Sequence, residues 1–178
     1  MKYSSTRFGT FEIADDSILT FPSGLLGFPE QHRYVILDHD TEAPFKWLQS
    51  LEEPTLAFVI LDPDLFLANY WVEISREVLV EVQGAETEDL TTAVILTIPS
   101  DDPGRITANL RGPLVINPRT RLGKQLVLSD EFPTRHPLFP SAAEDSGNKT
   151  QPAQSVEHSG EHALRAHIGH AADFVADS

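Results

Sequence analysis

The chain has 178 residues, 40% of them hydrophobic, and its 27 acidic against 13 Lys and Arg residues give a net charge of -14. Cysteine is absent, which excludes disulfides, thiolate metal sites and a cysteine nucleophile. The acidic excess disfavours a direct nucleic-acid binder, because neutralising phosphates supplies most of the affinity of such proteins. No apolar run is long enough for a membrane span or a signal-peptide core, so we expect a cytoplasmic protein.

Short apolar runs broken by proline or glycine fill residues 1–140 and predict a mainly β domain. The runs have strand length and are rich in β-branched or aromatic residues. Twelve of the 13 prolines lie in this part of the chain, mostly between the runs, where they end strand pairing rather than interrupt it. The predicted strands cover residues 18–21, 34–37, 45–51, 55–61, 93–98, 114–116 and 125–128.

The sequence predicts one helix, which begins after Ser75. Serine is a suitable N-cap, and Leu79 and Val82 are spaced so that they share one helical face. Gly84 can adopt the left-handed conformation that often ends a helix. A strand over residues 78–82 is the alternative, because β-branched residues are frequent in strands.

Residues 141–178 form a low-complexity segment, which we predict to be a largely disordered tail. Almost no large apolar residue precedes Leu164, so this segment cannot bury enough surface to offset its ordering entropy. A narrow apolar stripe could form an amphipathic helix near residues 162–176. Gly160 and Gly169 argue against that helix, and a solvated tail is favoured.

Two groups of residues have spacings that suggest a metal or acid–base site. Asp38, His39 and Asp40 are consecutive, but in an extended segment they point to opposite sides, and a polar loop is favoured. Phosphate-loop, dinucleotide, nucleophile-elbow and zinc-protease motifs are missing. We therefore predict no enzyme, no cofactor and no metal, with a metal-dependent hydrolase as the alternative. The other group is in the tail, where solvated side chains are favoured: His158, His162, His167 and His170.

The stretch NLRGPLVINPRTRLGKQLVL, residues 109–128, carries four bases and no acid. Residues 1–102 hold 19 acids against 5 bases, whereas residues 103–140 hold 2 acids against 6 bases. A turn at Gly112, a strand, a loop at residues 117–123 and a returning strand predict a hairpin. Its bases are predicted to neutralise neighbouring carboxylates or to contact acidic groups on a protein partner, rather than phosphate. A direct nucleic-acid binder is a further alternative.

Four motifs occur in an order that resembles the FliW family of flagellar assembly factors. They are FPSGLLGF from Phe21, PFKWLQSLEEPTLAFVILDP from Pro44, the NLRGP stretch from Asn109, and RHPL from Arg135. The resemblance covers about residues 6–138. It implies a small, barrel-like antiparallel β domain in the cytoplasm, without catalytic activity.

The resemblance also implies two protein partners. Proteins of this family bind flagellin and the RNA-binding translational repressor CsrA, and flagellin that occupies the factor leaves CsrA free to repress flagellin mRNA. Some residues depart from the family pattern: Ala68-Asn69-Tyr70 stands for Pro-Asp-Tyr, Gly112 for alanine and Phe132 for tyrosine. The candidate partner contacts are Leu25, Leu26, Phe28, Trp47, Tyr70, Asn109, Arg111, Arg119, Arg121 and Lys124.

Overall fold

The computed structural model describes residues 1–39, 44–139 and 164–166, which form a mainly β fold with one short α-helix. Within them, no helix has the length and apolar character needed to cross a bilayer. The strands are β1 (Lys2–Ser5), β2 (Gly9–Glu12), β3 (Leu19–Thr20), β4 (Arg33–Asp38), β5 (Lys46–Ser50), β6 (Ala57–Leu61), β7 (Val72–Ile74), β8 (Thr91–Thr97), β9 (Thr107–Ala108), β10 (Leu114–Asn117), β11 (Leu122–Gln125), β12 (His136–Pro137) and β13 (Leu164–Ala166). The helices are α1 (Arg76–Glu81) and the 3-10 turns η1 (Asp15–Ser17), η2 (Pro63–Leu65) and η3 (Thr87–Asp89).

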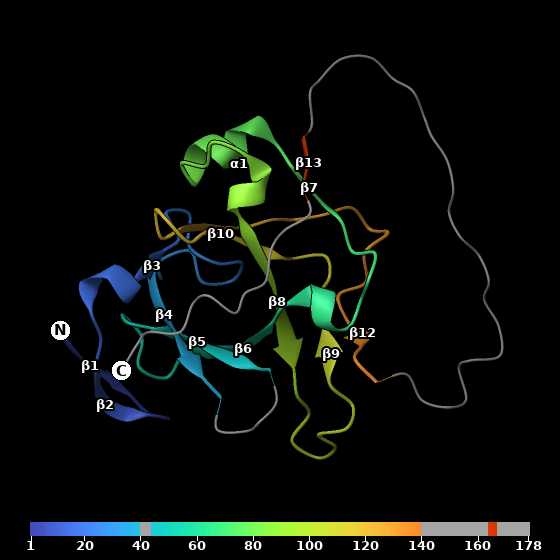
Figure 1. Ribbon diagram of the computed structural model, residues 1–178. Coiled ribbons are helices and arrows are strands. Elements are labelled where there is room, and N and C mark those ends of the chain that lie inside the picture. The colour runs from blue at the N-terminus through green and yellow to red at the C-terminus, as the bar shows by residue number, and fades with distance from the viewer. Residues whose placement is uncertain (40–43, 140–163, 167–178) are drawn as a thin grey trace, which may run out of the picture.

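Seven of the strands close into a barrel, which confirms the predicted fold class (Figure 1). They pair in the order β10-β11-β3-β4-β5-β6-β8, and β8 pairs in turn with β10, so the ring has no free edge. All contacts in the ring are antiparallel except the parallel bridge of Leu122 with Thr20. Beyond the ring, β9 and β12 extend the sheet from β8, and β1 and β2 form a separate hairpin.

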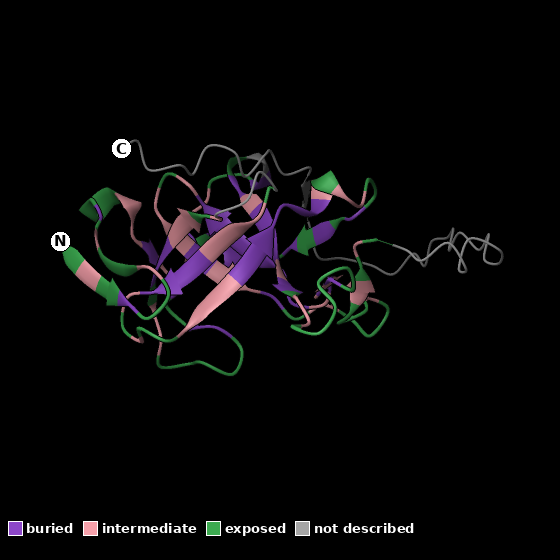
Figure 2. Cartoon of the chain, turned by 90° about the horizontal axis from the view of Figure 1, so that it is seen from below, coloured by how far each residue is buried: buried purple, intermediate pink, exposed green. Residues whose placement is uncertain are grey.

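Two hydrophobic cores lie on the two faces of this sheet. Successive residues of a strand point to opposite faces, so Val94 and Leu96 of β8 belong to one core and Ala93 to the other. The first core also receives α1 and β7, and the second is centred on Phe21 and Tyr34. The strands of the ring are therefore largely buried where they cross the centre of the molecule (Figure 2).

The turn after β3 has the tight reversal that its two glycines predict. Gly24 and Gly27 have φ values of +66° and +83°, which other residues rarely adopt. Leu25 and Phe28 exchange backbone hydrogen bonds across the turn, at 3.3 and 2.8 Å. A Cβ on Gly24 would lie 2.7 Å from the carbonyl oxygen of Phe28, so this position also requires glycine for space.

The helix α1 forms as predicted, but its last residues differ from the expectation. The Ser75 hydroxyl accepts a hydrogen bond from the Val78 amide and caps the helix. Gln83 takes the left-handed conformation, with φ of +54°, whereas Gly84 does not have a positive φ. The reversal comes one residue early, with the Gln83 and Gly84 amides bonding back to Val80 and Leu79.

The predicted hairpin is confirmed, although its second strand begins earlier than expected. β11 is Leu122–Gln125, not residues 125–128, and the connection is only four residues long. The early start is due to Arg121, which has a φ of +59° and reverses the chain direction just before β11. The Arg121 amide donates to the Asn117 carbonyl and closes the turn. After Gln125 the chain runs on beside the residues that precede β10, and the Leu126 and Leu128 amides donate to the carbonyls of Pro113 and Arg111, each at 2.8 Å.

Part of the tail is extended. Leu164–Ala166 form β13, which pairs antiparallel with β7. The rest of the tail, including the four histidines, lies outside the described residues.

Replacing Gly24 with alanine is expected to destabilise the protein by about 2 kcal/mol or more, because it adds a steric collision to the strain of a positive φ. Gly27→Ala is the matched control. Its φ is also positive, but nothing lies within 4 Å of the added Cβ, so a loss of about 1 kcal/mol is expected. Urea unfolding of both variants measures the difference, and equal losses would contradict the steric argument.

Candidate functional site

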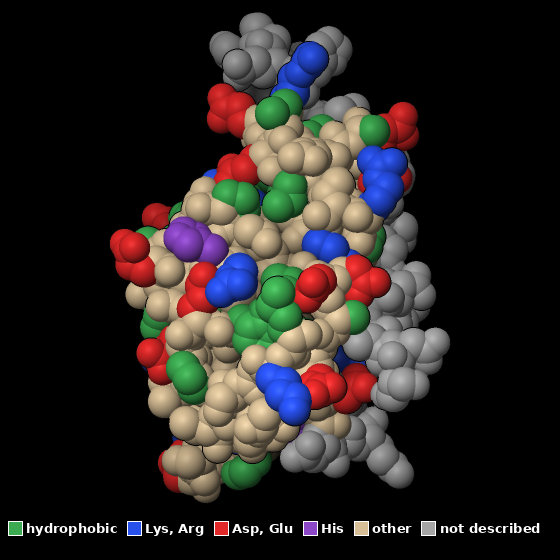
Figure 3. Space-filling view, turned by 90° about the vertical axis from the view of Figure 1, so that its left-hand side faces the viewer, with side chains coloured by type: hydrophobic (Ala, Val, Ile, Leu, Met, Phe, Trp, Pro, Cys, Tyr) green, Lys and Arg blue, Asp and Glu red, His purple; other side chains and the backbone are tan. Residues whose placement is uncertain are grey.

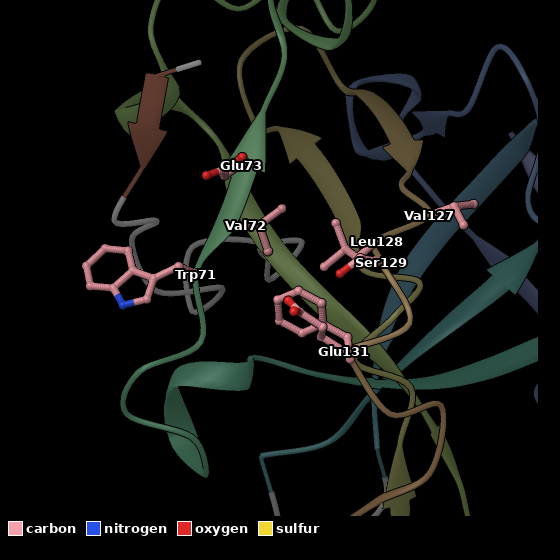
Figure 4. A pocket seen from close by; sticks show the side chains of 8 residues that line it. Trp71, Val72, Glu73, Val127, Leu128, Ser129 and Glu131 are labelled. Atoms are coloured by element: carbon pink, nitrogen blue, oxygen red, sulfur yellow. The ribbon is translucent and has the colours of Figure 1, made fainter. Parts of the chain in front are cut away.

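A groove of about 720 Å³ opens between β7 and the segment that follows β11 (Figure 4). One wall is β7 with the residue before it, and the other is the stretch from Val127 to Phe132. Its lining residues are Trp71, Val72, Glu73, Val127, Leu128, Ser129, Glu131 and Phe132.

The β7 wall combines an exposed aromatic residue with a carboxylate. Trp71 is 51% exposed, which is unusual for the largest apolar side chain. Val72 and Ile74 are buried in the first core, so the strand alternation turns Glu73 outward. In Figure 4, Trp71 lies on the side of β7 toward β13, and Leu128 lies on the opposite side.

The second wall is held in place by Arg111. Its guanidinium donates to the carbonyl oxygens of Phe132 and Asp130, at 3.0 and 3.1 Å, and forms an ion pair with the Asp130 carboxylate at 3.1 Å. The Asp130 side chain is 97% exposed, so the two carbonyl contacts contribute more to positioning than the ion pair. The Leu128 amide also donates to the Arg111 carbonyl at 2.8 Å.

Tyr70 precedes the β7 wall in the chain and contacts Phe132 of the second wall. It is buried, its hydroxyl donates to the Leu110 carbonyl at 2.6 Å, and its ring packs edge-on against Phe132 with centroids 5.8 Å apart. Burial raises the pKa of this hydroxyl, so it stays a neutral donor at any physiological pH. Tyr70 and Arg111, both predicted as partner contacts, therefore position the groove rather than line its open side.

The groove has the chemistry of a protein-binding surface. Trp71, Leu128 and Phe132 supply apolar contact, and Val127 is 69% exposed. Glu73 and Glu131 are both exposed, and no Lys or Arg is among the residues that line the groove. This combination suits an apolar polypeptide segment that carries basic residues.

The turn of Leu25, Leu26 and Phe28 is joined to the hairpin through Gln125. The Gln125 amide group accepts from the Leu26 amide at 2.8 Å and donates to the Gly112 carbonyl at 3.0 Å. Leu25 is buried in the second core, whereas Leu26 is 55% exposed and Phe28 38%. Two of these three residues are therefore available at the surface.

Lys124 belongs to a polar cluster on the helix rather than to an open basic patch. Its ammonium pairs with the Glu81 carboxylate at 2.8 Å, and the Ser23 hydroxyl donates to the same carboxylate at 2.7 Å. The hydrogen bond from Lys124 lowers the pKa of Glu81, burial partly opposes this, and Ser23 adds to the lowering. The cluster fixes α1 against β11 and the first glycine turn.

Trp47 is half-buried and packs against three neighbouring side chains. The Arg7 guanidinium stands 4.2 Å from the centroid of the indole, and the His39 ring is stacked on it at 5.2 Å with an interplanar angle of 8°. Phe8 adds an edge contact at 5.9 Å. These contacts join the segments around β1 and β4 to β5, and they leave Trp47 half-buried.

The remaining predicted residues lie in turns of the hairpin region. The Asn109 carboxamide oxygen accepts from the amides of Arg111 and Gly112, at 3.1 Å each, and so shapes the turn before β10. Arg121 occupies the left-handed position described above. Arg119 is exposed, and the part of the chain that the structure describes shows no ion pair to its guanidinium.

Sequence reasoning missed the residues that line the groove. In the sequence, Trp71 directly follows Tyr70, which was predicted as a partner contact. No local pattern indicates that Trp71 lies near Val127, which is more than fifty residues away along the chain. Glu73 and Glu131 were counted only as part of the net charge. Among residues 1–39, 44–139 and 164–166, no group of three potential ligands is placed to hold a metal ion.

Comparison with known proteins gives consistent matches. The family model described as FliW protein matches residues 2–138. A flagellar assembly factor FliW of Natranaerobius thermophilus is 41% identical over 154 residues, which is 86% of this chain and 99% of the relative. The protein of the same name from Leptospira interrogans is 40% identical over 141 residues, 79% of this chain and 94% of the relative.

A solved structure matches as well. A crystal structure of the flagellar assembly factor FliW superposes with a TM-score of 0.73 at 35% identity, and the match covers 80% of this chain and 99% of that one. The family match ends at residue 138, just after the second wall of the groove, so it includes the whole groove and leaves out β13.

Replacing Glu81 with glutamine is expected to lower the free energy of unfolding at neutral pH by about 1 kcal/mol, since it breaks a half-buried ion pair. The folded pKa of Glu81 is depressed, so its stabilisation is present above the ordinary carboxyl value of 4.5 and is lost as the pH falls through the lowered value. The difference between wild type and variant should therefore shrink in acid. Glu30→Gln, at an exposed carboxylate, controls for the loss of one charge, and a difference that persists unchanged in acid would contradict the assignment.

Proposed function

Because the chain belongs to the FliW family of flagellar assembly factors, we propose that it is a cytoplasmic partner switch that binds flagellin and sequesters CsrA. Flagellin that has not been exported occupies the protein and leaves CsrA free to repress flagellin translation. Export of flagellin releases the protein, which then binds CsrA and relieves the repression. The function needs only competing binding equilibria, and no catalytic step.

The groove beside β7 is the observation that supports the flagellin part of the proposal. Segments of flagellin that are unpaired before export present apolar faces, which need an apolar surface on their binder. Trp71, Val127 and Phe132 offer such a surface within a single groove. Aromatic residues in a concave site are the residue types that contribute most to protein–protein affinity.

The distribution of charge supports the CsrA part. An RNA-binding repressor is basic where RNA docks, and this protein carries a net charge of -14 that would attract it. On the face shown in Figure 3, acidic side chains are spread among basic ones around a central hydrophobic group, rather than gathered in one patch. The attraction therefore comes from the field of the whole surface and steers association, while apolar contacts hold the complex.

The basic hairpin does not favour a nucleic-acid partner. Lys124 is paired with Glu81, and Arg111 is bonded to carbonyl groups and to Asp130, so both cations are already compensated within the protein. A phosphate-binding surface needs uncompensated cations.

The three-component competition tests the proposal directly. Purified protein is expected to bind CsrA and flagellin separately with dissociation constants of about 1 µM or lower, and added flagellin should displace labelled CsrA. Fluorescence anisotropy follows the displacement. Failure to bind either protein would contradict the partner switch. So would a ternary complex in which flagellin does not lower the affinity for CsrA.

The groove variant Val127→Lys is expected to weaken flagellin binding about tenfold or more, because it puts a charge into the apolar contact and offsets the negative charge of the two carboxylates there. Val80→Lys is the matched control, since Val80 is 70% exposed against 69% for Val127 but lies on α1 outside the groove. Thermal melting checks that both variants are folded. Equal affinities of the two variants would place flagellin elsewhere on the surface.

A further inference from the structure

The two walls of the groove meet it along their edges. Three consecutive residues of each wall line it, residues 71–73 on one side and residues 127–129 on the other. Side chains of an extended segment alternate between its two faces, so a cavity on one face alone would touch every second residue. A cavity lined by consecutive residues instead runs along the edge of a segment, where the backbone N–H and C=O groups emerge.

The hydrogen bonds of the second wall fix the directions of its backbone groups. The amides of Leu126 and Leu128 donate to the segment that precedes β10, each at 2.8 Å. Successive residues of an antiparallel pair direct their N–H and C=O groups to alternate sides. The Val127 N–H and C=O and the Ser129 N–H therefore point away from that pairing, and none of the three has a hydrogen-bond partner among the described residues.

Both walls thus present a strand edge that another chain can extend. Val127 and Ser129 are exposed, so their outward backbone groups are accessible. Opposite them, β7 pairs with β13 on the side away from Leu128, and no other strand of the described residues pairs with it (Figure 4). An unpaired edge is a template for an added strand, whose backbone bonds to the edge.

The side chains of the groove specify which strand would fit. Val72 is buried, Leu128 and Phe132 are half-buried, and together these three residues form an apolar floor. Glu73 and Glu131 are exposed, and none of the described residues that line the groove is basic. Because the side chains of a strand alternate, an extended segment with apolar residues at every second position and Lys or Arg between them satisfies both requirements.

We infer that the groove receives its partner as an extended strand, which adds to the edge at Val127 and Ser129 and turns its apolar side chains toward the floor. The inference rests on the proposed function, since flagellin is the partner, and it specifies the conformation in which a flagellin segment binds. A helix bonds its backbone groups internally, so it would use the side chains of the groove and leave the edge unpaired.

Amide exchange followed by NMR tests the pairing residue by residue. In the free protein, the amides of Leu126 and Leu128 should exchange slowly, and those of Val127 and Ser129 about tenfold faster or more. Bound flagellin should slow the Val127 and Ser129 amides by about tenfold or more, because both become hydrogen-bonded. Flagellin that binds and leaves both amides fast would overturn the inference.

Ser129→Pro removes one of the three outward groups, because proline has no N–H. Ser129→Ala is the matched control, since it loses the same hydroxyl and keeps the amide. Flagellin is expected to bind the proline variant about tenfold more weakly than the alanine variant, the effect of one lost hydrogen bond whose partner stays buried. Thermal melting checks that both variants are folded, and equal affinities of the folded variants would contradict the strand pairing.

A synthetic peptide of alternating valine and lysine tests the site without flagellin and without a variant of the protein. It should bind with a dissociation constant of about 1 mM or lower and slow the Val127 amide. An extended peptide directs alternate amides to its two edges. N-methylation of the amides on one edge should therefore abolish binding, and methylation on the other edge should preserve it. No binding by the parent peptide, or equal affinities of the two methylated forms, would overturn the inference.

The outcomes separate this inference from the proposed function. If flagellin does not bind but the peptide binds through one edge, the proposed function fails and the strand site is supported. If flagellin binds and neither outward amide is slowed, the flagellin part of the proposed function is supported and strand addition is overturned.

Discussion

The closure of the sheet through β10 is the constraint on which the rest of the structure depends. β10 pairs with β8 on one side and with β11 on the other, and this double pairing joins the two ends of the seven-strand order into a ring. Because β10 is fixed on both sides, the chain entering it at Arg111 and the chain leaving β11 at Leu126 are brought together. Backbone hydrogen bonds then continue between them, from Leu126 to Pro113 and from Leu128 to Arg111. The second wall of the groove is the product of this continuation.

Polar side chains of the hairpin region connect elements that the ladder does not reach. Lys124 ties β11 to α1, Gln125 ties it to the first glycine turn, and Arg111 holds the segment up to Phe132. The contacts of Lys124 with Glu81 and of Arg111 with Phe132 satisfy a half-buried carboxylate and a half-buried carbonyl, which would otherwise cost free energy. The most basic stretch of an acidic chain thus has a structural use, and the partner surface is formed by apolar residues that these contacts position.

Local patterns predicted much of the fold. Apolar runs located most ring strands, the Ser75 cap located α1, and paired glycines located the turn at Gly24, because each of these depends on neighbours in sequence. The short strands β1, β2, β7, β9 and β12 were not predicted, since two to four residues of mixed polarity give no periodicity to detect. β11 was placed too late because the left-handed Arg121, unlike a glycine, gave no sign of the early reversal. Tyr70 and Arg111 were recognised as important residues, but their role as supports depends on burial, which a single sequence does not state.

The sequence by itself determined the class of the protein: a mainly β chain without cysteine, strongly acidic, with four motifs in the order of the FliW family. These properties are sums over the chain or patterns within short segments, and folding does not change them. Tertiary structure decided where a partner can bind. Trp71 and Val127 share a groove only because closure of the barrel brings distant segments together, and Trp47, an equally good candidate by residue type, is half-buried in contact with Arg7 and His39. Exposure of a side chain results from long-range packing, so the contact surface becomes visible only in the folded chain.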